Sequence, residues 1–284
     1  MNMARFTSAD TQRVTELGEQ VGSWVQATIG AATNKTRLQH KLDSIGSEAA
    51  LMRFLHRFVL FNDALAARVP YLAGLIHLTP DVFVDPDADE EFCRQCNGRI
   101  AAFVALAASD EYHLTEDRNM AHQYLSQQFF RGALAHYAVD GESFDRANPI
   151  PAQLAQMIEE ARTKFFDRRE PGEIFAALGF HTGLEFFANE EFNLVDVYLR
   201  TRHPALVAGL ERVDGQGQPY EWLAIHTVVE VGHYRAGLEA LKAAVKYYRS
   251  REGAPMMAEK IKEGFSAFID LQKRYYEDIL SDLH

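Results

Sequence analysis

Apolar residues recur at intervals of three and four along almost the whole chain of 284 residues. This spacing places them on one face of an α-helix, and the alternation typical of strands is nearly absent. The one β-branched cluster, VFV at 82–84, lies between Pro80 and Pro86, so we interpret it as a connector. The pattern predicts an all-α fold of about eight to ten helices.

Capping residues indicate where the early helices begin and end. Ser8 or Asp10 can open a first helix that stops near Gly30, and Ser47 can open one long helix over 48–76.

Later segments show the same signals. Helical periodicity continues over 87–110, 119–137 and 254–280, and Pro151 and Pro171 stand where a first-turn proline belongs. The sequence contains no internal repeat and no long linker. We therefore expect a single helical domain over 1–284, with an N-terminal helical extension (1–41), a metal-binding helical core (42–249) and a C-terminal helix (254–284).

Composition limits the function classes. Hydrophobic residues make up 47% of the chain, and the formal net charge is -11, which argues against a nucleic-acid partner. The N-terminus has no apolar signal-peptide core, and no apolar run approaches the length of a membrane span. These features predict a soluble, cytoplasmic protein that binds neither nucleic acid nor membrane.

The two cysteines, Cys93 and Cys96, form a C-x-x-C pair without the βαβ context of a redox motif or a second ligand pair for zinc. We interpret them as small, half-buried helix residues.

The stretch HTVVEVGHYRAGLEA (226–240) carries His226, Glu230 and His233 at offsets of zero, four and seven. On a helix these positions fall within about 60° of one another. Their neighbours, including Trp222 and Leu223, are apolar, so the three polar groups need partners in the interior. A metal ion is one such partner.

Other segments supply further candidate ligands. Glu185 interrupts an apolar stripe within 180–187, where a carboxylate is unusual unless it is paired, although a partly exposed helix edge is the alternative. Glu190 and Glu191 follow where the helix would turn a polar face to water.

Glu111 ends an apolar run, and His122 opens the next helix. Glu116 or Asp117 could replace Glu111 as a ligand, and His113 could replace His122.

The remaining histidines carry a weaker signal. We read His56, His136 and His181 as isolated core or surface histidines, and His40, His77, His203 and His284 as solvated residues near segment ends.

The order Glu111, His122, Glu185 and then His226-x3-Glu230-x2-His233 resembles the haem-oxygenase-like diiron oxidases, relatives of thiaminase II and pyrroloquinoline-quinone synthase. The likeness covers roughly residues 42–244 and implies a haem-oxygenase-like multi-helical bundle. Two departures stand out. Glu230 replaces the family's usual aspartate, and an additional early carboxylate used by some members has no clear counterpart here.

The resemblance implies a metal site formed by these six residues, with two iron ions per chain, manganese as an alternative metal, and O2 as co-substrate. Histidine and carboxylate ligands suit non-haem Fe(II). The implied reaction is oxidation of a small biosynthetic molecule such as an amino acid, amine or fatty acid, by N-oxygenation, desaturation, C–C cleavage or decarboxylation. Four cations could pair with a substrate carboxylate, although surface ion pairs are their ordinary role: Arg99, Arg131, Arg235 and Lys242. A homodimer is left open.

Two other function classes remain. One is a metal-independent enzyme of the same fold, either of the thiaminase II type, for which Cys93 and Cys96 are the only candidate nucleophiles, or of the quinone-cofactor-synthase type. The other is a non-enzymatic, ligand-binding helical bundle.

Overall fold

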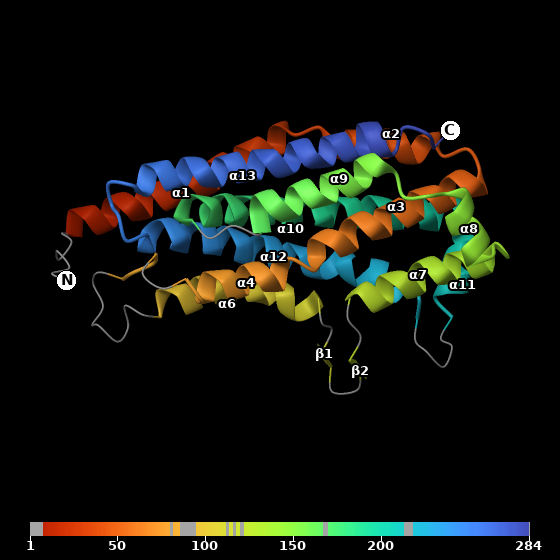
Figure 1. Cartoon of the computed structure of the whole chain (residues 1–284), viewed down its shortest axis with the longest axis horizontal. Coiled ribbons are helices and arrows are strands. Elements are labelled where there is room, and N and C mark those ends of the chain that lie inside the picture. Colours follow the sequence, from red (N-terminus) through yellow and green to blue (C-terminus); the bar gives the residue numbers. More distant parts are fainter. Residues whose placement is uncertain are drawn as a thin grey trace.

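The computed structural model describes residues 8–79, 82–85, 95–111, 114–115, 118–119, 122–166, 170–212 and 218–283. These residues form a single-domain bundle of helices, drawn lengthwise in Figure 1, and the predicted all-α class is confirmed. The helices are α1 (Ser8–Ala31), α2 (Asn34–Ser44), α3 (Glu48–Ala66), α4 (Val69–His77), α6 (Cys96–Glu111), α7 (His122–His136), α8 (Gly141–Ala147), α9 (Ala152–Ala161), α10 (Pro171–Arg202), α11 (Pro204–Leu210), α12 (Glu221–Tyr247) and α13 (Ala254–Arg274).

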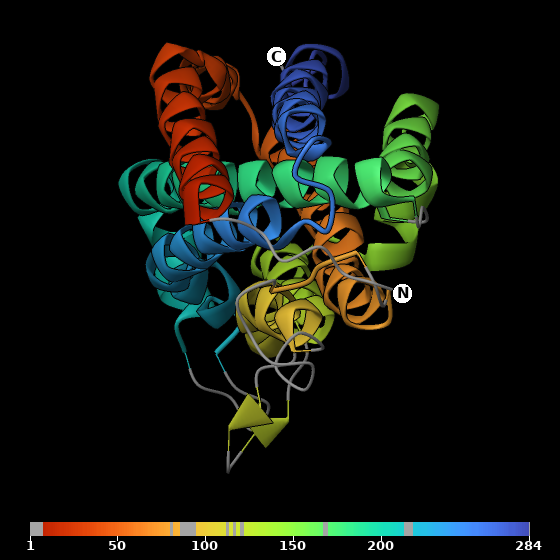
Figure 2. The same ribbon diagram turned by 90° about the vertical axis from the view of Figure 1, so that its left-hand side faces the viewer.

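Helix α10 crosses the middle of the bundle, between α13 on one side and α12 on the other (Figure 2). Most of its residues from Ile174 to Ala188 are buried, so it is covered on nearly every face. Glycines allow α13 to approach this closely. A Cβ atom on Gly264 would collide with the carbonyl oxygen of Ala176, and one on Gly179 would collide with that of Ile261. The crossing therefore depends on the absence of side chains at two positions.

The predicted long helix over 48–76 is two helices. Ser47 caps α3 as expected, because its hydroxyl accepts a hydrogen bond from the Ala50 amide at 3.2 Å. The chain then breaks at Ala67 and Arg68, since Pro70 at the start of α4 cannot continue the hydrogen-bonding ladder.

By length and hydropathy, the region Glu48–His77 could cross a membrane. This differs from the expectation that no apolar segment of the chain approaches the length of a membrane span. Its most apolar window is 56% buried inside the bundle, as in the core helix of a soluble protein. This region is thus weak evidence for a membrane span.

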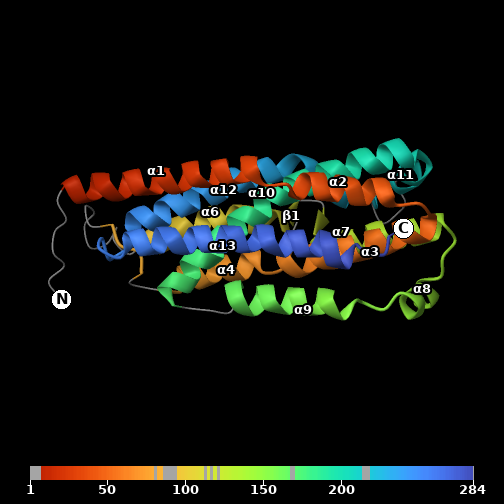
Figure 3. The same cartoon turned by 90° about the horizontal axis from the view of Figure 1, so that it is seen from above.

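Helix α1 has the predicted bounds and lies beside α12 and α13. Figure 3 shows α1 and α13 running alongside each other. Two π-helical turns, Arg162–Phe166 and Tyr275–Ile279, follow α9 and α13. The connector at 82–84 lies beside the end of α12, where Phe83 and Tyr248 form an isolated antiparallel β-bridge.

One short hairpin departs from the all-helical prediction. Strands β1 (Leu114–Thr115) and β2 (Arg118–Asn119) pair antiparallel between α6 and α7, with Leu114 opposite Asn119. Cys96 is buried at the start of α6, and Cys93 lies outside the described residues.

Candidate metal centre

Helices α10 and α12 bring three predicted ligands together in the interior. Glu185, Glu230 and His233 each offer one ligand atom, and these atoms lie within 4.8 Å of one another. His233 Nδ1 is 3.3 Å from Glu185 Oε2 and 3.2 Å from Glu230 Oε2. All three side chains are buried, so the shared face predicted for α12 does meet the carboxylate of α10.

These separations suit a metal ion. Two ligand atoms bonded at about 2.1 Å and at right angles to each other are about 3.0 Å apart. The two distances from His233 Nδ1 are close to that value, so small side-chain movements would place the three atoms around one ion. Within the part of the chain that the structure describes, Glu185, Glu230 and His233 form the one group of three or more His, Cys, Asp or Glu side chains that could hold a metal ion.

Glu230 also faces a second pair of side chains. Its other oxygen, Oε1, lies 3.8 Å from His226 Nε2, and that nitrogen lies 3.2 Å from His122 Nδ1. The carboxylate of Glu230 therefore lies between two pairs of possible metal ligands. His233 and Glu185 lie on one side of it, and His226 and His122 lie on the other. A carboxylate in this position can bridge two metal ions spaced by about 3.5–4 Å.

The ring of His226 is held in the orientation that a metal ligand needs. Its Nδ1 donates to the carbonyl oxygen of Trp222 at 2.6 Å, which leaves Nε2 with a lone pair that faces His122 Nδ1 at 3.2 Å and lies 3.8 Å from Glu230 Oε1. Burial, and then the neighbouring His122, hold the pKa of His226 well below its usual value. The imidazole is consequently neutral, and Phe192 stacks on it with ring centroids 4.3 Å apart.

His122 enters from α7 and is also buried. The indole nitrogen of Trp222 can only donate, so it donates to His122 Nε2 at 2.9 Å. The other nitrogen, Nδ1, then carries the proton toward His226. Packing of α7 on α12 thus brings together two histidines that are 104 residues apart in the chain.

The structure adds two residues that the sequence analysis did not select. Asp63 on α3 places Oδ1 3.4 Å from His122 Nε2, and His181 on α10 places Nδ1 3.1 Å from Glu185 Oε1. His181 was interpreted as an isolated histidine, yet its position four residues before Glu185 puts both on one helix face. Asp63 could have been noticed as a lone acid within the apolar segment of α3.

The charges in this cluster are strongly coupled. Burial, followed by the nearby Glu185, raises the pKa of Glu230 to about 8. Burial opposes the charge on His233, but the carboxylates of Glu185 and Glu230 outweigh it and raise the pKa of His233 to about 11. Burial likewise opposes the charge on Glu185, yet His181 and His233 hold its pKa well below the usual range. Without metal, an imidazolium at His233 neutralises the carboxylate of Glu185, while the raised pKa of Glu230 favours its protonated form at neutral pH.

Glu111 is the last residue of α6, and its side chain lies outside the described residues, as do its predicted alternatives Glu116 and Asp117 and the alternative histidine, His113. The backbone still places the end of α6. This helix runs antiparallel to α12, since Arg99 near its start bonds the hydroxyl of Tyr247 near the end of α12. Twelve residues of helix rise about 18 Å, which brings the end of α6 to the level of residues 233–237 on α12.

A buried carboxylate outside this cluster, that of Glu191, corrects a prediction. Glu191 was expected to turn to water, but it is 3% exposed and accepts hydrogen bonds from Gln272 Nε2 at 2.7 Å and from the hydroxyl of Tyr276. Gln272 is itself bonded by Asn34 at 2.8 Å. Burial raises the pKa of Glu191 to about 7, although these hydrogen bonds oppose the shift. Glu190 is half-buried.

No protein family, curated protein or solved structure matches this chain.

Proposed function

We propose that this protein is a non-haem, diiron-dependent oxidase or oxygenase of the haem-oxygenase-like class that activates O2 to act on a small molecule. The observation that carries the proposal is the position of Glu230, with one oxygen 3.2 Å from His233 and the other 3.8 Å from His226. One ion would be held by Glu185, Glu230 and His233. A second would lie on the side of His226 and His122, where Glu230 would bridge.

Unsatisfied polar atoms around the cluster support a missing cation. His181 Nε2 and Asp63 Oδ1 are buried and have no hydrogen-bond partner within the described parts of the chain. Leaving such groups unpaired costs about 1–3 kcal/mol each. A divalent ion would also allow Glu230 to ionise beside Glu185, because it would offset the repulsion of two buried carboxylates more fully than the single proton on His233 does.

A bound pair of iron ions would supply reduction of O2 for oxidation of a substrate. The chain's own residues prepare the site for it. Phe192 and Trp222 pack against His226 with ring centroids 4.3 and 5.9 Å away, which shields its imidazole from water. His181 Nδ1 lies 3.1 Å from Glu185 Oε1 and can orient that ligand by donating to it, and Asp63 places a carboxyl group beside His122.

The decisive test is iron stoichiometry after anaerobic loading with Fe(II) and removal of loose metal. We expect about two irons per chain for the wild type and a large loss for Glu230→Ala, because second-sphere and ligand changes cost at least 10–100-fold in affinity. Glu230→Asp should keep the metal, because a carboxylate remains. Glu191→Gln is the matched control, since it alters a buried glutamate of α10 outside the cluster and should bind iron normally.

Two results would contradict the proposal. One is a Glu230→Ala variant that binds as much iron as the wild type. The other is a wild type that retains no iron after the loading step and consumes no O2 in the presence of Fe(II). Mn(II) loading separates a preference for another metal from the absence of a site.

A metal-independent protein is the second candidate, favoured by the imidazolium of His233, which satisfies Glu185 and Glu230 without an ion. It predicts that no divalent metal raises the melting temperature. A metal that binds only the folded state must raise that temperature, by an amount that grows with the logarithm of its concentration over Kd.

A further inference from the structure

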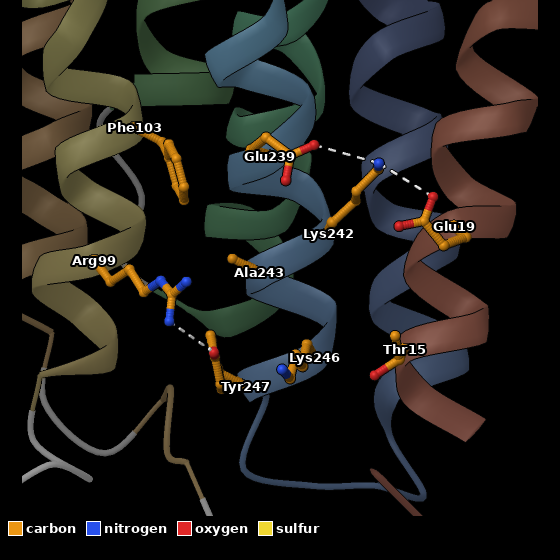
Figure 4. Close-up of a pocket in the computed structure, with 9 residues that line it drawn as sticks. All are labelled: Thr15, Glu19, Arg99, Phe103, Glu239, Lys242, Ala243, Lys246 and Tyr247. Carbon is orange, nitrogen blue, oxygen red and sulfur yellow. Dashed lines mark hydrogen bonds and ion pairs between the residues drawn. The ribbon is translucent and has the colours of Figure 1, made fainter. Parts of the chain in front are cut away.

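A pocket of about 190 Å³ lies away from the candidate metal centre, on one face of α12 between α6 and α1 (Figure 4). Its α12 residues begin at Glu239, six residues after His233, which is about 9 Å along the helix, and continue to Tyr247. Phe103 and Arg99 of α6 form one wall, and α1 forms the opposite wall.

Three cations line this pocket in a protein whose net charge is -11. Lys242 is neutralised, because its ammonium lies 3.1 Å from Glu19 and 3.3 Å from Glu239. Arg99 and Lys246 have no carboxylate partner within the described parts of the chain. The pocket therefore keeps one net positive charge after its two acids are counted against its three cations.

The two remaining cations gather on one aromatic ring. Arg99 lies 5.9 Å from the centroid of Tyr247, and the ammonium of Lys246 lies 5.2 Å from it. Arg99 Nη1 also donates to the hydroxyl of Tyr247 at 3.2 Å, which leaves the hydroxyl proton available for an acceptor. Two like charges held near one ring repel each other, and an anion beside the Tyr247 hydroxyl would offset that repulsion.

The size and lining of the pocket restrict that anion. An apolar cavity of about 150 Å³ accommodates a benzene molecule, so about 190 Å³ has room for one ring and a carboxylate. Phe103 and Ala243 provide an apolar surface for the ring. A single excess positive charge matches a monoanion better than the dianion of a phosphate ester.

We propose that this pocket binds a small monocarboxylate with an apolar body, with its carboxylate at Arg99, Lys246 and the Tyr247 hydroxyl, and its apolar part against Phe103. This site is separate from the metal centre and does not require that the protein bind iron. A ligand here would connect α6 to α12 about 9 Å or more from His233 along the helix.

Calorimetry of metal-free protein, residues 1–284, with sodium benzoate at low ionic strength tests the proposal, since screening by salt weakens exposed charge pairs. We expect one site per chain with Kd below about 1 mM. Arg99→Gln and Lys246→Gln should each weaken binding at least tenfold. Lys260→Gln, which removes an equivalent exposed cation on α13, should leave it unchanged.

Three outcomes would overturn the proposal: no benzoate binding, equal weakening by the Lys260→Gln control, or tighter binding of inorganic phosphate than of benzoate. Glu230→Ala provides the separation from the proposed function, because it should lose iron and still bind benzoate. Loss of benzoate binding in Glu230→Ala, with Arg99→Gln unaffected, would place the anion at the metal centre instead.

Discussion

Replacement of Glu191 by glutamine should stabilise this protein above neutral pH, since Glu191 is a carboxyl whose charged form burial disfavours. Its pKa rises from 4.5 to about 7 on folding. The folded state therefore binds the proton more tightly, so the contribution of Glu191 to stability is complete below pH 4.5 and is lost as pH rises through 7. Glutamine keeps the shape and can still accept from Gln272 and Tyr276, but it has no charge to bury.

The magnitude follows from the shift. A rise of about 2.5 pKa units at about 1.36 kcal/mol each gives about 3 kcal/mol as the largest difference between the variant and the wild type. The difference should be small at pH 4.5, grow by about 1.4 kcal/mol per pH unit and level off above pH 7. For a chain of this size, it corresponds to a rise in Tm of about 6–12 °C at pH 8.

Urea denaturation of metal-free wild type and Glu191→Gln at pH 5, 6, 7 and 8 measures the effect. Subtracting the two curves at each pH removes the contribution of the histidines in the metal centre, which both proteins share. Glu259→Gln on the exposed face of α13 is the control and should change stability by less than about 0.5 kcal/mol. A difference that stays flat from pH 5 to pH 8, or a variant less stable than the wild type at pH 8, would refute the reasoning.

Three further outcomes are expected. Gly264→Ala should destabilise the protein by about 3 kcal/mol or more, because the added methyl group would force α13 away from α10. Gly232→Ala, on the open face of α12, should instead stabilise the protein by about 0.5–1 kcal/mol. Urea denaturation midpoints compare the two variants, and equal effects would contradict the close crossing of α10 and α13. His122→Ala should impair occupancy of one metal position more than the other, which iron titration would show as a stoichiometry near one, and an unchanged stoichiometry would exclude this histidine as a ligand. Asp63→Asn should keep both ions but weaken the metal held near His122 about tenfold or more, as measured by competition with a chelator, and unchanged affinity would remove Asp63 from the site.

Much of the candidate site was predictable because it depends on the geometry of single helices. The spacing of His226, Glu230 and His233 puts them on one face of any α-helix, whatever surrounds it. Glu185 was recognisable because a carboxylate within an apolar stripe needs a partner. The same geometry links His181 to Glu185, so that residue was within reach of the sequence as well.

The remaining partners depend on contacts between helices that are distant in the chain. Asp63 lies beside His122 only because α3 packs on α7, and no local pattern encodes that approach. The break between α3 and α4 had a local cause in Pro70, but the apolar periodicity on both sides of it concealed the break.

Glu190 and Glu191 show most clearly which features depend on the local sequence and which depend on the tertiary structure. They are neighbours of the same type, and local sequence offers no reason to bury one and leave the other half-buried. The sequence by itself determined that α10 would be a helix and which residues share each of its faces, because backbone geometry fixes the angle between successive side chains. Only the tertiary structure decided that α13 and the turn after it cover the face of Glu191, because burial depends on which other helices pack there.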